Sequence, residues 1–274
     1  MVELVAPRVH LIAQTNLNSG GMADFLGDVG ATDWHTDTTN PAQYLIEVAG
    51  RLCYKAFGTR LNPNISKVRE GNEGYIGNII KSGHGSVLEH ATCTFAVLGI
   101  TPVFTHELVR HRVGTAFSQQ SGRYVRIEDL GFFWPGALGD GALIDHLGGP
   151  SQSRAAIGLV SDKGDKLLEA MEEFQREFAR LLRMDDITDF DLKKRLTSFQ
   201  RRFAPYGLET SVIFTANHRM IRYMIGKRTS PHAEVEIAQV FNEIASKMEE
   251  DFPAIYQDMV YSEEFGYTFS AEHV

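Results

Sequence analysis

Hydrophobic positions along the chain follow two different periods, which together predict a mixture of strands and helices. Residues 91–100 (ATCTFAVLGI) are rich in Thr, Val and aromatic residues, as is typical of a strand. Farther along, Leu168, Met171 and Phe178 belong to an apolar stripe with helical spacing, which predicts an amphipathic helix packed on a core. The same criteria predict strands over residues 8–15, 91–100 and 124–127, and helices from Pro41, over 73–81, from Pro102, and over 167–182, 190–202, 208–225 and 233–250.

Two long segments lack either period. Residues 16–40 are rich in Gly, Asp and Thr, and residues 133–165 contain many glycines and few apolar repeats. We therefore expect a loop at the first segment and an insertion at the second. Because helical sequence resumes after residue 165, we expect residues 1–274 to form a single α+β domain. Its sheet should be small, mainly antiparallel and flanked by helices, and its C-terminal half should be rich in helices.

Composition narrows the classes of function. The chain has 274 residues, of which 43% are hydrophobic, and a formal net charge of −8. The negative charge disfavours nucleic acid as a partner, so any basic site must be local. There are only two cysteines and no CxxC pair, which favours reduced thiols over a disulfide framework. A secretory leader and a membrane-length apolar run are both missing, which predicts a cytoplasmic protein with no membrane partner.

The stretch RHRVGTAFSQQSGRY, residues 110–124, concentrates the chemistry that can bind an anion. Arg110, Arg112 and Arg123 offer planar donors that suit phosphates and carbonyl edges. Gly114 and Gly122 allow tight turns or a close approach of the backbone to a ligand. This pattern predicts a site for a nucleotide-like small molecule, whereas an isolated Arg-His-Arg would indicate only a solvated basic loop.

Three further clusters of polar residues need explanation. The first is Gly83-His-Gly-Ser-Val-Leu-Glu-His90, between a predicted helix and a strand, where histidines could line a pocket or simply lie on the surface. Its two histidines are six residues apart and no dense set of Cys, His or acidic partners follows them, so we expect no metal site. The second cluster comprises residues 201–219. The third, residues 227–232, could instead be a simple helix C-cap.

Several common catalytic motifs are missing from the sequence. It has no GxSxG elbow, no Walker A loop and no strand–GxGxxG–helix unit. A serine hydrolase, a P-loop enzyme and a Rossmann enzyme are therefore all disfavoured.

Taken together, the ordered clusters resemble the flavin-dependent thymidylate synthases (the ThyX type) from about residue 49 to about residue 259. The family signature is Arg-His-Arg, seven residues and then Ser, usually followed by Gly-Arg-Tyr. Here residues 110–112 and 121–124 match its two ends, with eight residues between them. Residues 83–90 resemble GHxxxxEH of the family, and residues 228–237 resemble R-x-x-x-H-A-x-x-E-I. Residues 1–40 and 133–165 have no counterpart in this pattern.

The resemblance implies an enzyme with a ThyX-like fold that converts dUMP to dTMP. Its cofactor is FAD, and its co-substrates are 5,10-methylenetetrahydrofolate as carbon donor and NADPH as reductant. It also implies a homotetramer in which dUMP stacks on the flavin at sites between subunits. Because the flavin carries the redox chemistry, no cysteine nucleophile is needed.

The resemblance assigns roles residue by residue. Arg228 is the expected catalytic residue, because it would lie against the uracil and favour its N3-deprotonated form. His84 is expected to border the route of the folate or nicotinamide. The expected dUMP-binding residues are Glu107, Arg110, Gln119, Ser121, Gly122, Arg123, Arg201 and Arg228. The expected FAD-binding residues are Ser86, Arg110, His111, Arg112, Gln119, Asn217, Arg219 and Tyr223.

Some positions depart from the family pattern. Gln119 stands where relatives frequently carry Glu, and Tyr223 where they often carry Asn. We expect Cys53 to pack near the site rather than act as a nucleophile, and His90 and Glu236 to support the fold. The longer motif and Gln119 leave two alternatives open: an enzyme for another pyrimidine nucleotide, or a nucleotide- and flavin-binding protein without turnover.

Overall fold

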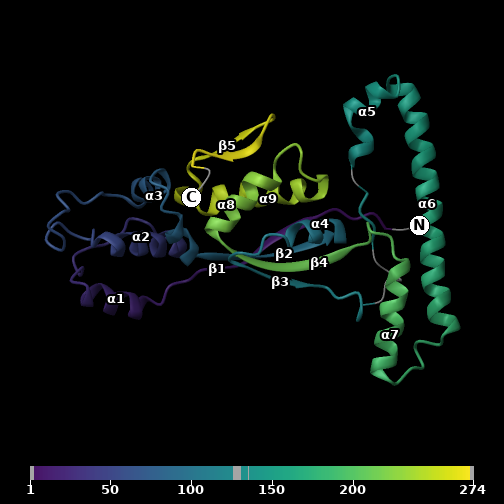
Figure 1. Ribbon diagram of the computed structural model, residues 1–274, viewed down its shortest axis with the longest axis horizontal. Coiled ribbons are helices and arrows are strands. Elements are labelled where there is room, and N and C mark those ends of the chain that lie inside the picture. Colours follow the sequence, from purple (N-terminus) through teal and green to yellow (C-terminus); the bar gives the residue numbers. More distant parts are fainter. Residues whose placement is uncertain (1–2, 126–130, 135, 272–274) are drawn as a thin grey trace. The chain divides into compact units, whose positions relative to one another are not determined.

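The computed structural model describes residues 3–125, 131–134 and 136–271, which form two compact units (Figure 1). The first unit comprises residues 1–8, 97–108 and 118–212, and the second comprises residues 9–96, 109–117 and 213–274. Within the described residues, no helix combines the length and the apolar character needed to cross a membrane.

The described residues form strands separated by runs of helices, followed by a C-terminal hairpin. The strands are β1 (Arg8–Gln14), β2 (Thr92–Ile100), β3 (Thr115–Gln119), β4 (Thr210–Asn217), β5 (Met259–Ser262) and β6 (Gly266–Phe269). The α-helices are α1 (Ser19–Asp28), α2 (Pro41–Tyr54), α3 (Asn72–Lys81), α4 (Pro102–Leu108), α5 (Gly141–His146), α6 (Pro150–Leu181), α7 (Phe190–Gln200), α8 (His218–Arg228), α9 (Val235–Asp251) and α10 (Pro253–Tyr256). Short 3-10 helices are η1 (Gly85–His90), η2 (Gly136–Gly139) and η3 (Arg201–Phe203).

Four strands form one sheet in the order β1-β2-β4-β3, and β5 pairs with β6 in a separate hairpin. Hydrogen bonds at the two ends of the β3–β4 pair show its direction. The Asn217 N–H donates to the Gly114 carbonyl at 3.2 Å, and the Gln120 N–H donates to the Ser211 carbonyl at 2.9 Å. The numbering therefore rises along one strand as it falls along the other, which makes the pair antiparallel. The predicted α+β class with a small, mainly antiparallel sheet is confirmed.

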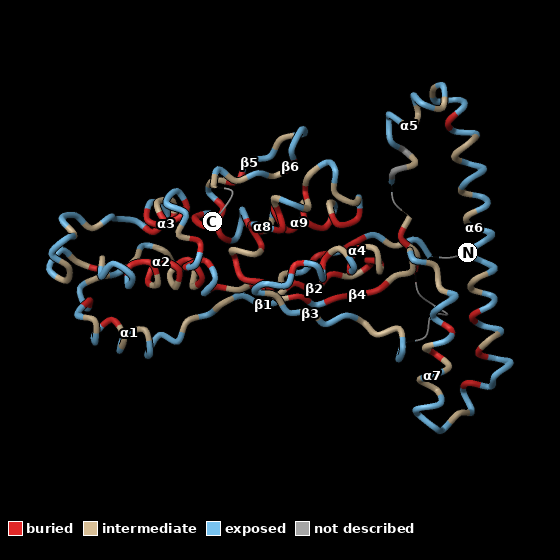
Figure 2. Tube along the Cα trace, viewed as in Figure 1, coloured by how far each residue is buried: buried red, intermediate tan, exposed pale blue. Residues whose placement is uncertain are grey.

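In the second unit, the helix α9 covers one face of the sheet (Figure 1). Its buried face carries Phe241, whose ring lies 6.4 Å from that of Phe214 on β4, and Phe214 stacks on Phe95 of β2 at 5.1 Å. All three side chains are fully buried, and burial of each aromatic ring contributes about 1.5–3 kcal/mol. In Figure 2 the buried face of α9 follows the predicted stripe of apolar residues.

A buried ion pair anchors the segments around α2. Arg51, which is 2% exposed, donates from Nε and Nη2 to Glu47, and its remaining donors reach the carbonyls of Ala56 and Arg69. The other Glu47 oxygen accepts from Asn72 Nδ2 at 2.7 Å. Four of the five N–H donors of this guanidinium are therefore hydrogen-bonded, which offsets the cost of burying its charge. This network explains how residues 58–72, which lack any hydrophobic period, stay attached to the core.

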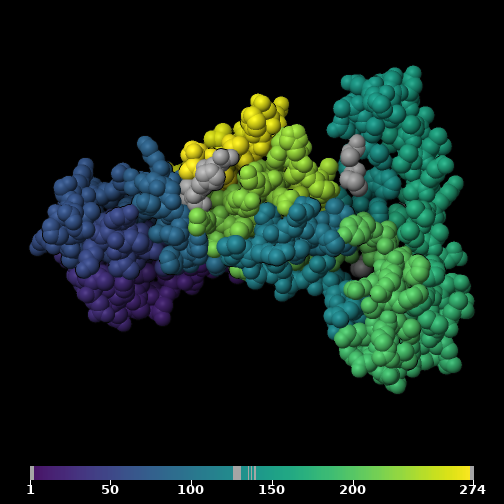
Figure 3. Space-filling view, viewed as in Figure 1, coloured from purple at the N-terminus to yellow at the C-terminus, as the bar shows by residue number. Residues whose placement is uncertain are grey.

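In the first unit, α6 and α7 pack side by side (Figure 3). The rings of Phe178 on α6 and Phe199 on α7 stack at 5.6 Å. Gln175 and Gln200 are buried and donate to each other's backbone carbonyls at 3.4 and 2.9 Å. Mixed apolar and reciprocal polar contacts therefore fix this helix pair.

The loop predicted over residues 16–40 was wrong, and helices also formed within residues 133–165, where no period was visible. Residues 16–40 contain α1, which Asn18 caps by accepting from the Gly21 N–H, and whose Leu26 belongs to a small hydrophobic cluster. Residues 133–165 contain α5 and the first half of α6. Most of α6 is exposed (Figure 2), so helix formers on its surface left no apolar stripe for the pattern to show.

The helix predicted over residues 208–225 and the strand predicted over residues 124–127 were also wrong. Residues 208–225 are not one helix, because β4 occupies Thr210–Asn217 before α8 begins. The β-branched TSVIFTAN segment fits a half-buried strand better than a helix. The strand predicted at 124–127 lies instead at Thr115–Gln119. Tyr124 and Val125 lie in a turn, and residues 126–127 fall outside the described residues.

His218, the first residue of α8, makes stability depend on pH. Burial, reinforced by the Arg222 charge, lowers the pKa of His218 to about 3. The unfolded chain binds this proton near pH 6.5 and the folded chain does not, so the free energy of unfolding should fall as pH decreases from about 6.5 toward 3. The free energy of unfolding can be measured with urea at pH 7 and at pH 5. Its decrease between the two should be about 2 kcal/mol smaller in His218→Gln than in the wild type. His10→Gln, at an exposed position, should leave the decrease between pH 7 and pH 5 unaltered. Equal effects of His10→Gln and His218→Gln on this decrease would contradict the prediction.

Candidate active site

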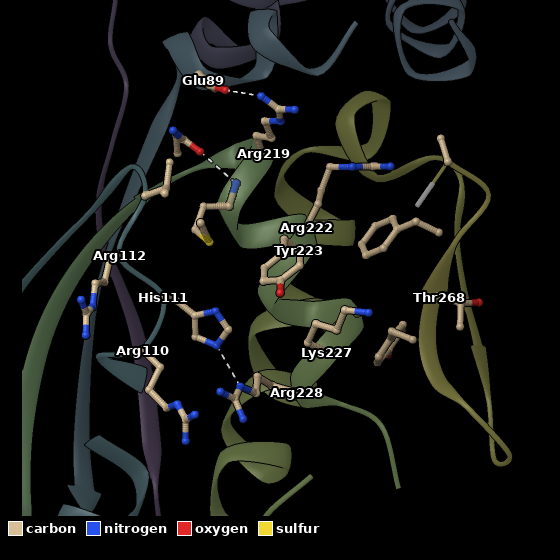
Figure 4. A pocket seen from close by; sticks show the side chains of 17 residues that line it. Glu89, Arg110, His111, Arg112, Arg219, Arg222, Tyr223, Lys227, Arg228 and Thr268 are labelled. Carbon is tan, nitrogen blue, oxygen red and sulfur yellow. Dashed lines mark hydrogen bonds and ion pairs between the residues drawn. The ribbon is translucent and has the colours of Figure 1, made fainter. Parts of the chain in front are cut away.

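The second unit contains a cavity of about 850 Å³, within the range typical of cofactor sites. Figure 4 shows α8 between the Arg110–Arg112 segment on one side and the C-terminal hairpin on the other. The lining residues are Glu89, Arg110, His111, Arg112, Val113, Asn217, Arg219, Met220, Arg222, Tyr223, Gly226, Lys227, Arg228, Tyr267, Thr268, Phe269 and Ala271. We call this cavity the α8 cavity.

The contact between Gly114 and Asn217 fixes two sides of this cavity relative to each other. Asn217 ends β4 and caps α8 by accepting from the Met220 N–H at 2.9 Å, while its own N–H donates to the Gly114 carbonyl. Gly114 has φ +66°, and a Cβ there would lie 2.3 Å from Asn217 Nδ2. Only glycine tolerates both the left-handed backbone and this close approach. The Arg-His-Arg segment and the start of α8 are therefore joined at one point.

His111 and Arg228 face each other across the cavity (Figure 4). Arg228 Nε donates to His111 Nε2 at 2.8 Å. Because an arginine is always protonated, His111 must accept at Nε2, which fixes a neutral ring with its proton on Nδ1. His111 is 7% exposed, and the edge of its ring contacts Tyr223 at a centroid distance of 5.8 Å. The bond fixes the orientation of the Arg228 guanidinium.

Cations dominate the lining. Among its described residues are five arginines, one lysine and one acid, Glu89. Glu89 pairs with Arg219 at 2.5 Å, an exposed pair of small energetic value. Arg222 is buried and pairs at 2.7 Å with Asp258, which is not part of the lining. Burial alone would raise the pKa of Asp258, but hydrogen bonds from Arg222 and Ser270 outweigh it and lower the pKa below 3.8. The cavity therefore favours an anionic ligand.

Neither cysteine lines the α8 cavity. Cys93 is fully buried beside His218, and burial raises the pKa of its thiol to about 12. Cys53 is exposed, and its Sγ donates to the Ala49 carbonyl at 3.4 Å. A reactive thiolate needs an electropositive, accessible setting, which Cys93 lacks. Tyr256, which bonds His218 Nδ1 at 3.1 Å, likewise has a pKa raised by burial.

A second cavity of about 480 Å³ lies within the first unit. It collects Gln119, Gly122 and Arg201 from separate parts of the sequence. Its lining residues are Pro102, Gln119, Gln120, Gly122, Val125, Arg201, Arg202, Ala204, Pro205, Tyr206, Leu208, Glu209 and Thr210. Tyr206 bonds His106 Nδ1 at 2.9 Å through its hydroxyl. We call this cavity the η3 cavity, after the 3-10 helix that carries its two arginines.

The two cavities divide the predicted site residues. The α8 cavity gathers Arg110, His111, Arg112, Asn217, Arg219, Tyr223 and Arg228, and the η3 cavity gathers Gln119, Gly122 and Arg201. Ser86, Glu107, Ser121, Arg123 and His84 line neither cavity. Of these, Ser121 Oγ accepts from the Arg123 N–H at 3.4 Å, and the His84 ring stacks on Tyr54 at 5.9 Å. The expected roles of these residues remain predictions.

Sequence reasoning missed several lining residues. Arg219, Tyr223 and Lys227 repeat every four residues, so helical spacing could have placed Lys227 in the cavity rather than in a simple cap. Arg222 and Met220 carried no such signal. Tyr267 and Phe269 belong to the C-terminal hairpin, beyond every motif, and only the tertiary structure brings them to α8.

Comparison with known proteins agrees with this geometry. The model of the family described as "Thymidylate synthase complementing protein" matches residues 36–254. A "Flavin-dependent thymidylate synthase" of Mycobacterium avium (strain 104) is 34% identical over 259 residues, covering 94% of this chain and 92% of that protein. Its counterpart in Mycobacterium tuberculosis (strain H37Rv) is 33% identical with the same coverage.

Solved structures show the same fold. The crystal structure of a UMP/dUMP methylase PolB from Streptomyces cacaoi, bound with 5-Br UMP, superposes with a TM-score of 0.62 at 19% identity. It covers 93% of this chain and 95% of that one. The same protein bound with 5-Br dUMP gives a TM-score of 0.61.

An α+β fold with a cation-lined cavity beside an Arg-His-Arg segment defines a protein suited to bind an anionic ligand. More specifically, the chain belongs to the flavin-dependent thymidylate synthases, a family of methyltransferase enzymes. The predicted resemblance is thereby confirmed.

Gly114→Ala tests the junction that holds the cavity together. The new Cβ would add the strain of a left-handed alanine to a clash with Asn217. The free energy of unfolding measured with urea should therefore fall by about 1–3 kcal/mol. Gly83→Ala is the matched control, because Gly83 has φ +69° and nothing lies within 4 Å of the position its new methyl group would take. Equal losses in the two variants would show that the Asn217 contact contributes nothing.

Proposed function

We propose that this protein catalyses the reductive methylation of dUMP to dTMP, with 5,10-methylenetetrahydrofolate as carbon donor and NADPH as reductant through FAD. The observation that carries the proposal is the α8 cavity, in which the family's Arg-His-Arg segment meets Arg228 within the matched residues 36–254. The relatives' shared name supports a flavin cofactor.

The residues of the α8 cavity fit a flavin dinucleotide. A pyrophosphate needs fixed donors, and Arg110, Arg112 and Lys227 supply cations beside the neutral His111. Tyr223 is half exposed and offers an apolar face. Ser86, Gln119, Asn217 and Arg219 complete the proposed FAD set. When bound, the flavin passes electrons from NADPH to the one-carbon unit, which must be reduced from methylene to methyl.

The η3 cavity fits part of the nucleotide. Arg201 and Gly122 lie together there, because a Cβ on Gly122 would sit 3.7 Å from Arg201 Cδ. An arginine beside a half-buried glycine backbone suits a phosphate. We assign dUMP binding to Glu107, Arg110, Gln119, Ser121, Gly122, Arg123, Arg201 and Arg228, and the folate or nicotinamide route to His84.

Arg228 is the proposed catalytic residue. Its cation would lie against the uracil and favour the N3-deprotonated ring, which is more electron-rich at C5. The bond from Arg228 Nε to His111 supports this role, because it presents the guanidinium in one orientation before ligand binds.

The assembly and setting follow the family pattern. We propose a cytoplasmic homotetramer of single-domain subunits, with active sites between subunits and no nucleic-acid or membrane partner. The formal net charge of −8 supports the absence of a polyanionic partner.

UMP is the second candidate substrate. The structural neighbour is described as a UMP/dUMP methylase, and its crystals contain analogues of both nucleotides. Methylation of UMP by the same site would differ from that of dUMP only in tolerance of the ribose 2′-hydroxyl.

The decisive assay supplies FAD-loaded protein with dUMP, methylenetetrahydrofolate and NADPH, and follows dTMP by chromatography. We expect yellow protein and dTMP that depends on all three substrates. A parallel reaction with UMP distinguishes the two candidates by product. If flavin-loaded protein forms neither methylated nucleotide, the proposed function is wrong.

Arg228→Ala should lower kcat by at least about a hundredfold, because the charge at the uracil is lost together with the hydrogen bond to His111. Flavin absorbance and subunit assembly should remain. Arg176→Ala is the matched control, since Arg176 on α6 is exposed, pairs with Glu172 one turn away and lines neither cavity. Disassembly of Arg228→Ala on size-exclusion chromatography would show that Arg228 is structural.

A further inference from the structure

The C-terminal hairpin lies outside the matched part of the family. Its strands β5 and β6 pair antiparallel, with Tyr261 opposite Tyr267 and Ser262 opposite Gly266. The match to the family model ends at residue 254, before the hairpin begins. The cavity beside it nevertheless contains the family's own motif residues.

This hairpin supplies one wall of the α8 cavity. Tyr267, Thr268, Phe269 and Ala271 all belong to the lining. Figure 4 shows β6 on the side of α8 opposite to the Arg-His-Arg segment, and Figure 3 shows the hairpin in yellow against α8 and α9. A ligand that fills the cavity therefore contacts both the family motif and a segment outside the family match.

The first fastening of the hairpin is at Thr229, the residue after Arg228. Thr229 is 5% exposed, and its Oγ1 donates to the Ile225 carbonyl and accepts from the Tyr267 N–H, both at 2.9 Å. Gly266 has φ +72°, and a Cβ there would lie 2.1 Å from the Thr229 carbonyl oxygen. The turn of β6 is therefore pressed directly onto the end of α8 from which Arg228 projects.

The second fastening is at Arg222, in the middle of α8. Arg222 is 3% exposed and binds both carboxylate oxygens of Asp258, at 2.7 and 3.0 Å. Its guanidinium also lies 4.2 Å from the centre of the Phe269 ring, and Ser270 Oγ donates to Asp258 at 3.1 Å. Residues on both sides of the hairpin are thus held by one buried cation.

We propose that the C-terminal hairpin is the cofactor-retaining wall of the α8 cavity, and that its fastening at Thr229 and Gly266 sets the affinity for the flavin dinucleotide. Two clamps hold the wall in place before ligand arrives, so the ordering cost of binding is small. The inference rests on the proposed function, because it takes the flavin as the ligand of this cavity. The nucleotide residues of the η3 cavity have no part in it.

Gly266→Ala tests the fastening. Its Cβ would meet the Thr229 carbonyl, so β6 must move away from α8. FAD titrated into the full-length apoprotein, followed by flavin fluorescence, should bind with a Kd raised at least about tenfold. At saturating FAD, the KM for dUMP should stay within about twofold, because Gly122 and Arg201 of the η3 cavity are not part of the altered contact.

Two further variants keep the test decisive. Thr229→Val preserves shape but removes the acceptor for the Tyr267 N–H, and it should weaken FAD binding in the same direction if Gly266→Ala does not fold. Gly148→Ala is the control: Gly148 has φ +87°, and its nearest neighbour would be 4.0 Å from the new Cβ. It carries the backbone strain without the clash and should bind FAD like the wild type.

Each outcome decides between the two proposals. Wild-type protein that fails to bind FAD overturns both. Wild-type binding with unchanged Kd in Gly266→Ala and Thr229→Val overturns only the role of the hairpin, even if both variants melt at lower temperature. Weakened FAD binding in either folded variant, with Gly148→Ala unaffected, supports it.

Discussion

The contact between Gly114 and Asn217 is the constraint on which the cavity depends. Asn217 ends a strand, begins a helix, and lies too close to Gly114 for any side chain to fit at that position. Gly114 comes two residues after Arg112, so this one contact sets the distance between the Arg-His-Arg segment and α8. At the other end of α8, the hydrogen bond from Arg228 to His111 joins the same two segments a second time. Two points of attachment leave the intervening segment little freedom.

The second unit uses arginine in two different ways. Arg51 and Arg222 are almost fully buried, and each is neutralised by a carboxylate and fixed by carbonyl oxygens, so they hold segments together. Arg110 and Arg112 are exposed on the cavity wall, where a cation can meet an anionic ligand. Residue type does not separate these roles. Burial does, because a buried charge must be paired whereas an exposed one can meet a ligand.

Three buried groups at the start of α8 stay uncharged near neutral pH. His218, Tyr256 and Cys93 are buried together, and burial moves the pKa of each away from neutrality in the direction that keeps it uncharged. The charge facing the α8 cavity comes from five arginines, one lysine and Glu89. This arrangement suits a family whose difficult chemistry is carried by a cofactor, since the protein needs to supply position and fixed charge rather than a nucleophile.

The sequence alone determined the family, the α+β class and the segments that carry chemistry, because those depend on local patterns and short motifs. It placed Arg110 to Arg112, Asn217 and Arg228 in the site, and the structure brings them to one cavity. It missed α1 and the first half of α6, whose exposed surfaces leave no periodic trace, and it read β4 as helix. Only the tertiary structure decided that Arg222 is a buried anchor and that Tyr267 borders the cavity. Those roles depend on contacts between residues far apart in sequence, whose burial and spacing no local pattern records.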